Sequence, residues 1–467
     1  AVGDSTLANQ NAGVDAYNVA VGHNAGLSVT TGTHNVLLGG LAGDALTTGS
    51  ANIAIGYEAL STEDGHSQNV AIGYQALKML DAGAAALNVA VGHQAGTAMS
   101  TGVNNTIVGG LAGDALTTGE SNVAIGKEAL STEDTGHDNV AVGHQALTTL
   151  NTGSSGYNTA VGRRAGYVMS TGIQNTIIGA NAGDAITSGS YNTALGYNAL
   201  STEDAGSYSV AIGTSALRDQ DAGNAYNVAI GYEAGKVVST GTYNTLIGGK
   251  AGDALTTGGY NVAVGYQALS AEDTQGLNTA VGTYALASLN AASNAYNTAV
   301  GYNVGTAMTT GTDNTLMGAF AGDALTTGAY NVAIGRSALS TEDAYGYNVA
   351  VGAFALLNQD AGDNAFNTAV GYNAGAAILT GIRNTLIGGS AGDTLTTGSY
   401  NVAVGYEALS TEDANGRNVA IGYQALTTQN AGADAYNVAV GFYAGTAVTT
   451  GVQNTLIGGE AGITSTS

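Results

Sequence analysis

The sequence predicts an all-β fold, a parallel β-roll or β-solenoid in which each coil uses 17–19 residues. Two observations predict this fold: one short motif recurs along the chain at nearly constant spacing, and its residues alternate between bulky and small side chains. A fixed repeat period is typical of solenoids, and alternation with a period of two is typical of strands. Together they indicate a stack of equivalent coils.

The repeated motif is Asn, Val or Thr, a small or aliphatic residue, an aliphatic residue and Gly, usually with Ala three residues after the Gly. It occurs 26 times, from Asn18 to Asn454, and only Ser209 replaces the leading Asn. The spacing is 17, 17, 17 and then 19 residues (once 18), so four units form a super-repeat, starting near residues 18, 88, 158, 227, 297, 367 and 437. We interpret residues 1–467 as a single array of about 27 coils whose ends are truncated or covered by other domains or subunits.

Within the motif, Val19 and Val21 are expected to point to one side of a strand and Ala20 to the other, with Val and Ile filling one face. The Gly permits a close backbone approach that a side chain would block. Stacked Asn residues are expected to form a ladder in which each amide satisfies the next. These structural roles apply to every copy of the motif, for example at Asn18, Gly22, Asn52, Gly56, Asn122, Gly126, Asn261 and Gly265.

The chain length of one unit fits one narrow coil. About 17 residues at roughly 3.3 Å give about 56 Å of path, enough for two short facing sides and two crossings of about 10 Å. Stacked at about 4.8 Å, the coils would form a rod near 130 Å long. Because so thin a roll has a poor core, and its Ala and Gly face invites another backbone, we expect a homotrimer.

Four units per super-repeat would also suit the four-stranded blades of a β-propeller. Alternate strands of a blade run antiparallel and lie at different radii, so they rarely share one motif. The common motif therefore favours the roll.

The composition argues against several classes of function. The net charge is −24, with 10 Lys and Arg against 34 Asp and Glu, which argues against a nucleic-acid partner. The chain has no Cys, and no apolar run approaches the roughly 18 residues of a membrane helix, so we expect no membrane insertion. No phosphate loop, nucleophile elbow or dinucleotide fingerprint is present, and we predict no catalytic residue, no cofactor and no enzymatic activity.

Stretches such as Asn-Val-Ala-Ile-Gly-Tyr-Glu-Ala and Asn-Thr-Ala-Val-Gly-Tyr-Asn-Ala resemble the head repeats of trimeric autotransporter adhesins and the repeats of bacteriophage tail fibres. The resemblance covers almost the whole chain, although the adhesin repeats are usually shorter. It implies a left-handed parallel β-roll with three chains to a fibre, which binds host surfaces or matrix proteins. We therefore expect an extracellular structural or adhesive fibre on a cell or virion. Its expected partners are further copies of itself, as a homotrimer or an end-to-end filament, and a host-surface glycan or protein.

Two other functions stay open: a repeat lectin of the β-propeller type, and an ice-binding β-solenoid with an array of Thr-Gly turns. Metal ligation is a further possibility in the acidic linkers, where carboxylates can bind Ca²⁺. The competing interpretation is that they cap turns and solvate the surface. The candidate residues are Asp44, Glu63, Asp64, Asp114, Glu133 and Asp134.

Tyr residues recur beside the motif and after its Gly. Exposed rings can anchor a sugar or a protein partner, or they can stack between coils and stabilise the roll. The candidate surface contacts are Tyr57, Tyr74, Tyr232 and Tyr406.

Overall fold

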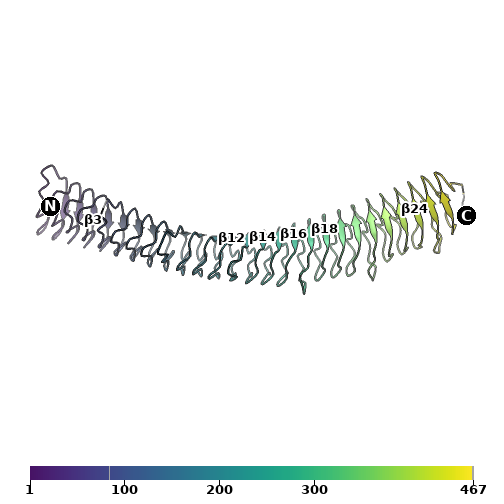
Figure 1. Cartoon of the computed structure of the whole chain (residues 1–467), viewed down its shortest axis with the longest axis horizontal. Helices are drawn as coiled ribbons and strands as arrows, with labels where there is room; N and C mark the ends of the chain where they lie inside the picture. Colours follow the sequence, from purple (N-terminus) through teal and green to yellow (C-terminus); the bar gives the residue numbers. More distant parts are fainter. Residues whose placement is uncertain (84, 465–467) are drawn as a thin grey trace. The chain divides into compact units, whose positions relative to one another are not determined.

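The structure, a computed structural model, describes residues 1–83 and 85–464. Residues 84 and 465–467 of the expected array lie outside this part. The chain divides into two compact units, Ala1–Glu233 and Ala234–Ser467, and each is a parallel β-solenoid of short strands separated by turns (Figure 1). No helix occurs in the described residues, and therefore none that could cross a membrane.

Every strand has three residues, the second to fourth of the motif. In the first unit these are β1 (Val19–Val21), β2 (Val36–Leu38), β3 (Ile53–Ile55), β4 (Val70–Ile72), β5 (Val89–Val91), β6 (Thr106–Val108), β7 (Val123–Ile125), β8 (Val140–Val142), β9 (Thr159–Val161), β10 (Thr176–Ile178), β11 (Thr193–Leu195), β12 (Val210–Ile212) and β13 (Val228–Ile230). In the second unit they are β14 (Thr245–Ile247), β15 (Val262–Val264), β16 (Thr279–Val281), β17 (Thr298–Val300), β18 (Thr315–Met317), β19 (Val332–Ile334), β20 (Val349–Val351), β21 (Thr368–Val370), β22 (Thr385–Ile387), β23 (Val402–Val404), β24 (Val419–Ile421), β25 (Val438–Val440) and β26 (Thr455–Ile457).

Within each unit, consecutive strands pair in parallel and in register with the repeat. In β3 and β4, for example, Ala54 lies beside Ala71, one motif spacing later. A bridge between Val2 and Val21 adds the partial coil at the start of the sequence. The prediction of one parallel coil per unit is confirmed, and the antiparallel blades of a propeller are not what these strands form.

The rest of each coil differs from the two-sided roll that the sequence suggested. The apolar pair that follows the motif Gly, such as Ala76 and Leu77, does not form a second strand, because Gln75 and Leu77 adopt left-handed φ values of 55° and 47°. These residues form successive turns that still bond to the next coil: the Leu77 N–H donates to the Ala95 carbonyl at 3.0 Å. Each coil therefore has one strand and a turn-rich return path.

The motif Gly is required by both conformation and space. From Gly22 to Gly458 its φ lies between 126° and 148°, a region that is essentially restricted to Gly. A Cβ at Gly39 would lie 2.5 Å from the carbonyl oxygen of Gly56 in the next coil. The predicted close approach of backbones is confirmed.

The Asn ladder is present, with a different partner from the one expected. The buried Asn52 accepts the backbone N–H of Asn69 through Oδ1 at 2.9 Å, and its Nδ2 donates to the His66 carbonyl at 2.9 Å. The amide-to-amide bond from Asn69 Nδ2 to Asn52 Oδ1 is longer, at 3.4 Å. Each Asn therefore joins coils mainly through backbone groups.

The interior is built mainly from Ala and Leu, with some Val, Ile and Met side chains such as Val29 and Ile107. The expectation that the Val and Ile residues at the first and third strand positions fill it is wrong. The middle residue of the strand, such as Ala54, is fully buried, whereas the Ile residues on either side of it are only half-buried. Because the coil is narrow, a large side chain on one side of its interior requires a small residue on the opposite side. Where the strand carries Leu37, Gly26 and Gly43 face it, and a Cβ at either Gly would meet its methyl groups. In the third and fourth units of each super-repeat the strand carries Ala and a buried Leu follows the second Ala, as at Leu60, whereas in the first unit Gly takes that position, as at Gly26.

Replacing a motif Gly tests this arrangement. We expect Gly126→Ala, at φ 135° and against the Gly143 carbonyl, to lower the free energy of unfolding by roughly 3 kcal/mol, because it combines backbone strain with overpacking. Thermal unfolding followed by circular dichroism measures the loss. Gly110→Ala is the matched control, because a Cβ there meets nothing within 4 Å. Equal effects of the two changes would contradict this explanation.

Candidate functional site

The outward face of the sheet is not covered by the packing inside the coils. The first and third residues of each strand form two parallel rows along each unit, one of Val, Thr or Ile and the other of Val, Ile, Leu or Met. None of the 26 strands in the described part of the chain contains a charged residue. Most side chains in these rows are half-buried and some are exposed, for example Leu195 at 42% and Met317 at 46%. Apolar faces of this kind mark interaction surfaces.

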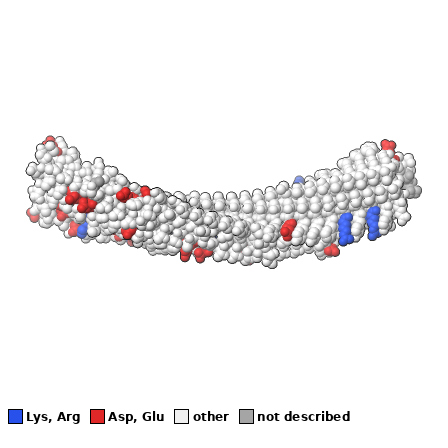
Figure 2. Space-filling model, viewed as in Figure 1, with Lys and Arg blue, Asp and Glu red and all other residues white. Residues whose placement is uncertain are grey.

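The second unit shows this face clearly. Over strands β18 to β24 most of the surface in Figure 2 is uncharged, with acidic and basic side chains along its lower border and a basic side chain at its upper edge. Further acidic side chains form patches elsewhere on the face in view. This region therefore presents a low-charge surface on an otherwise acidic protein.

Aromatic side chains border the sheet, one row before the motif Asn and one after the motif Gly. Many of the rings stack face to face: Tyr191 and Tyr208 have centroids 5.2 Å apart and planes within 3°, and Tyr208 and Tyr226 are 5.0 Å apart and within 1°. Others meet edge to face, as Tyr266 and Tyr284 do. Because the ring faces contact each other, edges and hydroxyl groups are what these ladders offer to a partner. The geometry is that of stacking between coils.

Three of the four Tyr residues predicted as surface contacts stack on a ring of a neighbouring coil. Tyr57 stacks on Tyr74 at 5.8 Å, and Tyr406 stacks on Tyr423 at 5.5 Å. All four candidates are exposed, and Tyr232 is 55% exposed. Stacking and exposure therefore coexist at Tyr57, Tyr74 and Tyr406, and their contact with a partner stays a prediction.

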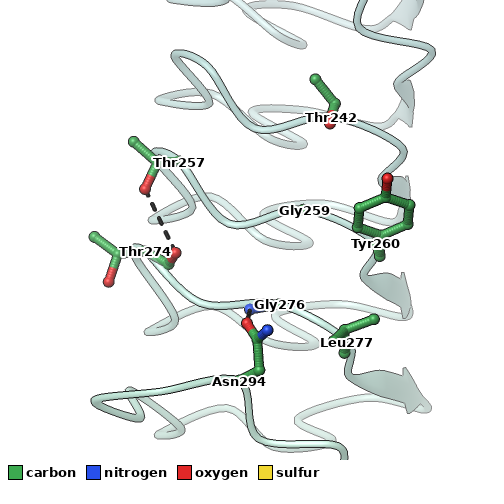
Figure 3. Close-up of a pocket in the computed structure, with 8 residues that line it drawn as sticks. All are labelled: Thr242, Thr257, Gly259, Tyr260, Thr274, Gly276, Leu277 and Asn294. Carbon is green, nitrogen blue, oxygen red and sulfur yellow. Dashed lines mark hydrogen bonds between the residues drawn. The ribbon is translucent and has the colours of Figure 1, made fainter.

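A shallow hollow of about 370 Å³ interrupts one ladder (Figure 3). Leu277 takes the ladder position after Tyr260, and its smaller side chain leaves the space open. The hollow is lined by Thr242, Thr257, Gly259, Tyr260, Thr274, Gly276, Leu277 and Asn294. Two of its polar groups are already engaged, since Thr257 donates to the Thr274 carbonyl and the Gly276 N–H donates to Asn294. Uncharged polar groups beside a ring could contact a sugar edge.

The acidic candidates fall into two sets. Asp44 and Asp114 lie in the Ala-Gly-Asp turns, and each has one carboxylate oxygen, Oδ1, that is buried without a hydrogen-bond partner. Burial raises the pKa of both carboxyl groups. The structure does not bring Asp44 together with Glu63 or Asp64 in a common cluster of possible ligands.

Glu63 and Glu133 are fully buried, which differs from the solvating role considered for them. Turn capping is confirmed: Glu63 Oε1 accepts the His66 N–H at 3.0 Å, and Glu133 Oε1 accepts the Gly136 N–H at 2.8 Å. The neighbouring Asp64 is exposed and Asp134 is half-buried. The linker Glu therefore turns inward while the Asp beside it stays near the surface.

Sequence reasoning missed the residues that surround these Glu side chains. Gln220 donates to Glu203 Oε2 at 2.8 Å, and Gln359 donates to Glu342 Oε2 at 3.0 Å. The signal was available, because each Gln follows its Glu by 17 residues, which is one coil. The structure also brings together two groups of side chains that could bind a metal ion. One is Glu63, Asp64, His66 and Asp81, and the other is Glu342, Asp343 and Asp360.

Comparison with known protein families and with curated proteins found no match to this chain.

The buried Glu row predicts an unusual dependence of stability on pH. Burial raises the pKa of Glu272 above its ordinary 4.5, and the same holds for Glu63, Glu203, Glu342 and Glu412. A raised pKa means that the folded chain binds the proton more readily than the unfolded chain. The contribution of this row to stability is therefore least favourable at neutral pH and improves as pH falls through the raised pKa values towards 4.5.

Glu272→Gln tests this prediction, since Oε2 of Glu272 is buried without a partner. We expect the variant to be more stable than the parent at pH 7, by on the order of 1 kcal/mol, because a buried charge is removed. The difference should shrink towards pH 4.5 in thermal unfolding curves. The exposed Glu120→Gln serves as control. A loss of stability that is the same at both pH values would refute the prediction.

Proposed function

We propose that this chain is the shaft or head of an extracellular attachment fibre in which three copies pack together through their outward sheet faces. The observation that carries the proposal is the pair of uncharged, aliphatic and Thr rows that each unit exposes along its whole series of strands. Removing such a face from water is the main driving force of stable association.

The packing inside each coil explains why another chain must cover the outward sheet face. Ala and Leu side chains already fill each coil, as at Ala71 and Leu77, so the Val and Ile rows have no place within it. The face open to a partner is thus the one with Val and Ile, rather than the Ala and Gly face considered from the sequence. Many acidic residues lie in the linkers, as at Asp44, Glu63 and Asp64, so joining sheet faces need not bring these carboxylates together.

Attachment itself would use the borders of the sheet. Tyr edges and hydroxyl groups line these borders, and they can donate hydrogen bonds to a glycan or a host protein. Repetition along the fibre would give many weak contacts a combined strength. The fibre thereby serves as a rigid spacer and as a multivalent surface.

An ice-binding role receives less support from the Thr-Gly turns. Thr30 Oγ1 donates to the Thr47 carbonyl at 3.1 Å, and Thr47 Oγ1 donates to the Asp64 carbonyl at 2.9 Å. These hydroxyl groups join neighbouring coils, which favours a structural role for the turns.

The oligomeric state tests the proposed assembly. By light scattering after size-exclusion chromatography we expect a species of three 45.8 kDa chains. A triple variant in which Lys replaces Ile55, Ile125 and Leu195 should be monomeric, because three charges would enter an apolar interface. Matched Lys replacements at the exposed linker residues Thr48, Thr118 and Ser188 should leave the trimer intact.

A monomeric parent chain, or equal effects of the two triple variants, would contradict the proposal. Circular dichroism confirms that each variant remains folded. Thermal hysteresis measured on the same samples would support the ice-binding alternative instead.

A further inference from the structure

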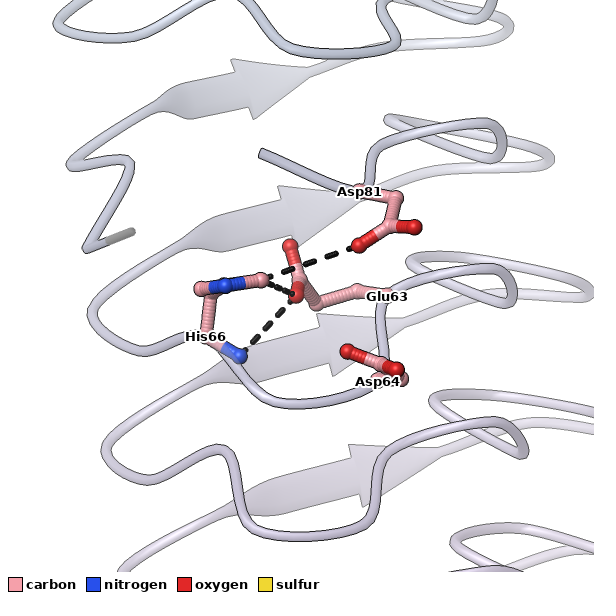
Figure 4. A group of neighbouring side chains, drawn as sticks. All are labelled: Glu63, Asp64, His66 and Asp81. Atoms are coloured by element: carbon pink, nitrogen blue, oxygen red, sulfur yellow. Dashed lines mark hydrogen bonds and ion pairs between the residues drawn. The ribbon is translucent and has the colours of Figure 1, made fainter. Parts of the chain in front are cut away.

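The cluster of Glu63, Asp64, His66 and Asp81 lies in the first unit, where a linker meets the linker of the next coil. The four side chains offer ligand atoms that all lie within 4.8 Å of one another. Figure 4 shows the Glu63 carboxylate between His66 and the coil that carries Asp81. His66 Nδ1 is 2.6 Å from Glu63 Oε1 and 3.8 Å from Asp81 Oδ1.

One atom of this cluster is unsatisfied. The Glu63 side chain is fully buried, and its Oε2 has no hydrogen-bond partner. A buried carboxylate oxygen in this state is costly unless a cation or donor reaches it. The other oxygen is occupied by the His66 N–H at 3.0 Å. The vacant oxygen therefore points to a ligand that the protein itself does not provide.

Equivalent positions in other super-repeats differ in whether the chain satisfies this oxygen. At Glu272 and Glu412 it also has no partner, but Gln275 and Asn415 stand there in place of His66. At Glu342 the amide of Gln359 donates to Oε2 at 3.0 Å, whereas Leu80 holds that position beside Glu63. At Glu133, which also has a Leu one coil later, the N–H and hydroxyl of Thr152 donate to Oε2, both at 3.2 Å. Neither donor is present at Glu63, where His66 and Asp81 are added instead.

We propose that Glu63, Asp64, His66 and Asp81 bind a divalent transition-metal cation such as Zn²⁺. An imidazole nitrogen combined with carboxylate oxygens suits Zn²⁺ and related ions, whereas Ca²⁺ takes oxygen ligands alone. The cation would replace the short His66–Glu63 contact, neutralise the buried carboxylate and join two successive coils. The oxygen-only cluster at Glu342 lacks both the imidazole, since Tyr345 replaces His66, and the vacant oxygen. The site is independent of the proposed fibre function.

Titration of the metal-free chain with Co²⁺, followed by its visible absorption, and competition with Zn²⁺ test the proposal. We expect one site per chain and weak competition by Ca²⁺. His66→Tyr and Asp81→Asn reproduce residues found at equivalent positions, Tyr345 and Asn151, so both should fold. Each should weaken binding by on the order of tenfold or more, since even indirect ligand support is worth that much.

Two further variants make the result decisive. His144→Tyr, on an exposed residue outside the cluster, should leave binding unchanged. Leu80→Gln should stabilise the metal-free chain and reduce the thermal shift that the metal produces, because an amide would then reach Glu63 as Gln359 reaches Glu342. Absence of one-to-one binding, equal losses in His66→Tyr and His144→Tyr, or equal affinity for Ca²⁺ and Zn²⁺ would each overturn the assignment.

Discussion

The backbone of each coil bonds to the backbone of the next, so closely that only Gly fits at one position of every motif. The motif Asn reinforces this contact from inside, where its amide bonds to backbone groups of the following coil, as Asn52 does with Asn69 and His66. Left-handed residues such as Gln75 and Leu77 are costly in isolation, by about 1–2 kcal/mol each. Stacking holds them, so stability belongs to neighbouring coils jointly and not to one coil alone.

This constraint determines which side chains face inward. A coil so narrow accepts Ala from the strand and Leu from the return path, or Leu from the strand where Gly faces it, as with Leu37 and Gly26. The β-branched residues are consequently directed outward, where they form the face that we propose joins three chains. Most polar residues inside have partners: the linker Glu residues accept hydrogen bonds from Gln220, Thr152 or, at Glu63, His66, although Oε2 of Glu63 and of Glu272 has none.

Much of the fold followed from the sequence because one motif recurs in one phase. The parallel coils, the role of Gly22 and its equivalents and the Asn ladder were all predictable from spacing and residue type. Which face of each strand lies inside the coil was not predictable, because alternating large and small side chains define two faces without indicating which one is buried. The burial of Glu63 was missed because charge usually indicates exposure, and its proximity to Asp81 depends on which linkers become adjacent after stacking.

Distances between equivalent residues of different coils test the parallel stacking of the coils most directly. The chain has no Cys, so nitroxide labels can be placed on cysteines introduced pairwise at the exposed linker residues Thr48, Thr118 and Ser188 of the first unit. With unlabelled chain in excess, pulsed electron resonance should give about 19 Å for four coils, between 48 and 118, and about 38 Å for eight, between 48 and 188. Distances that fail to double would contradict the parallel stack on which the fold and the proposed fibre both depend.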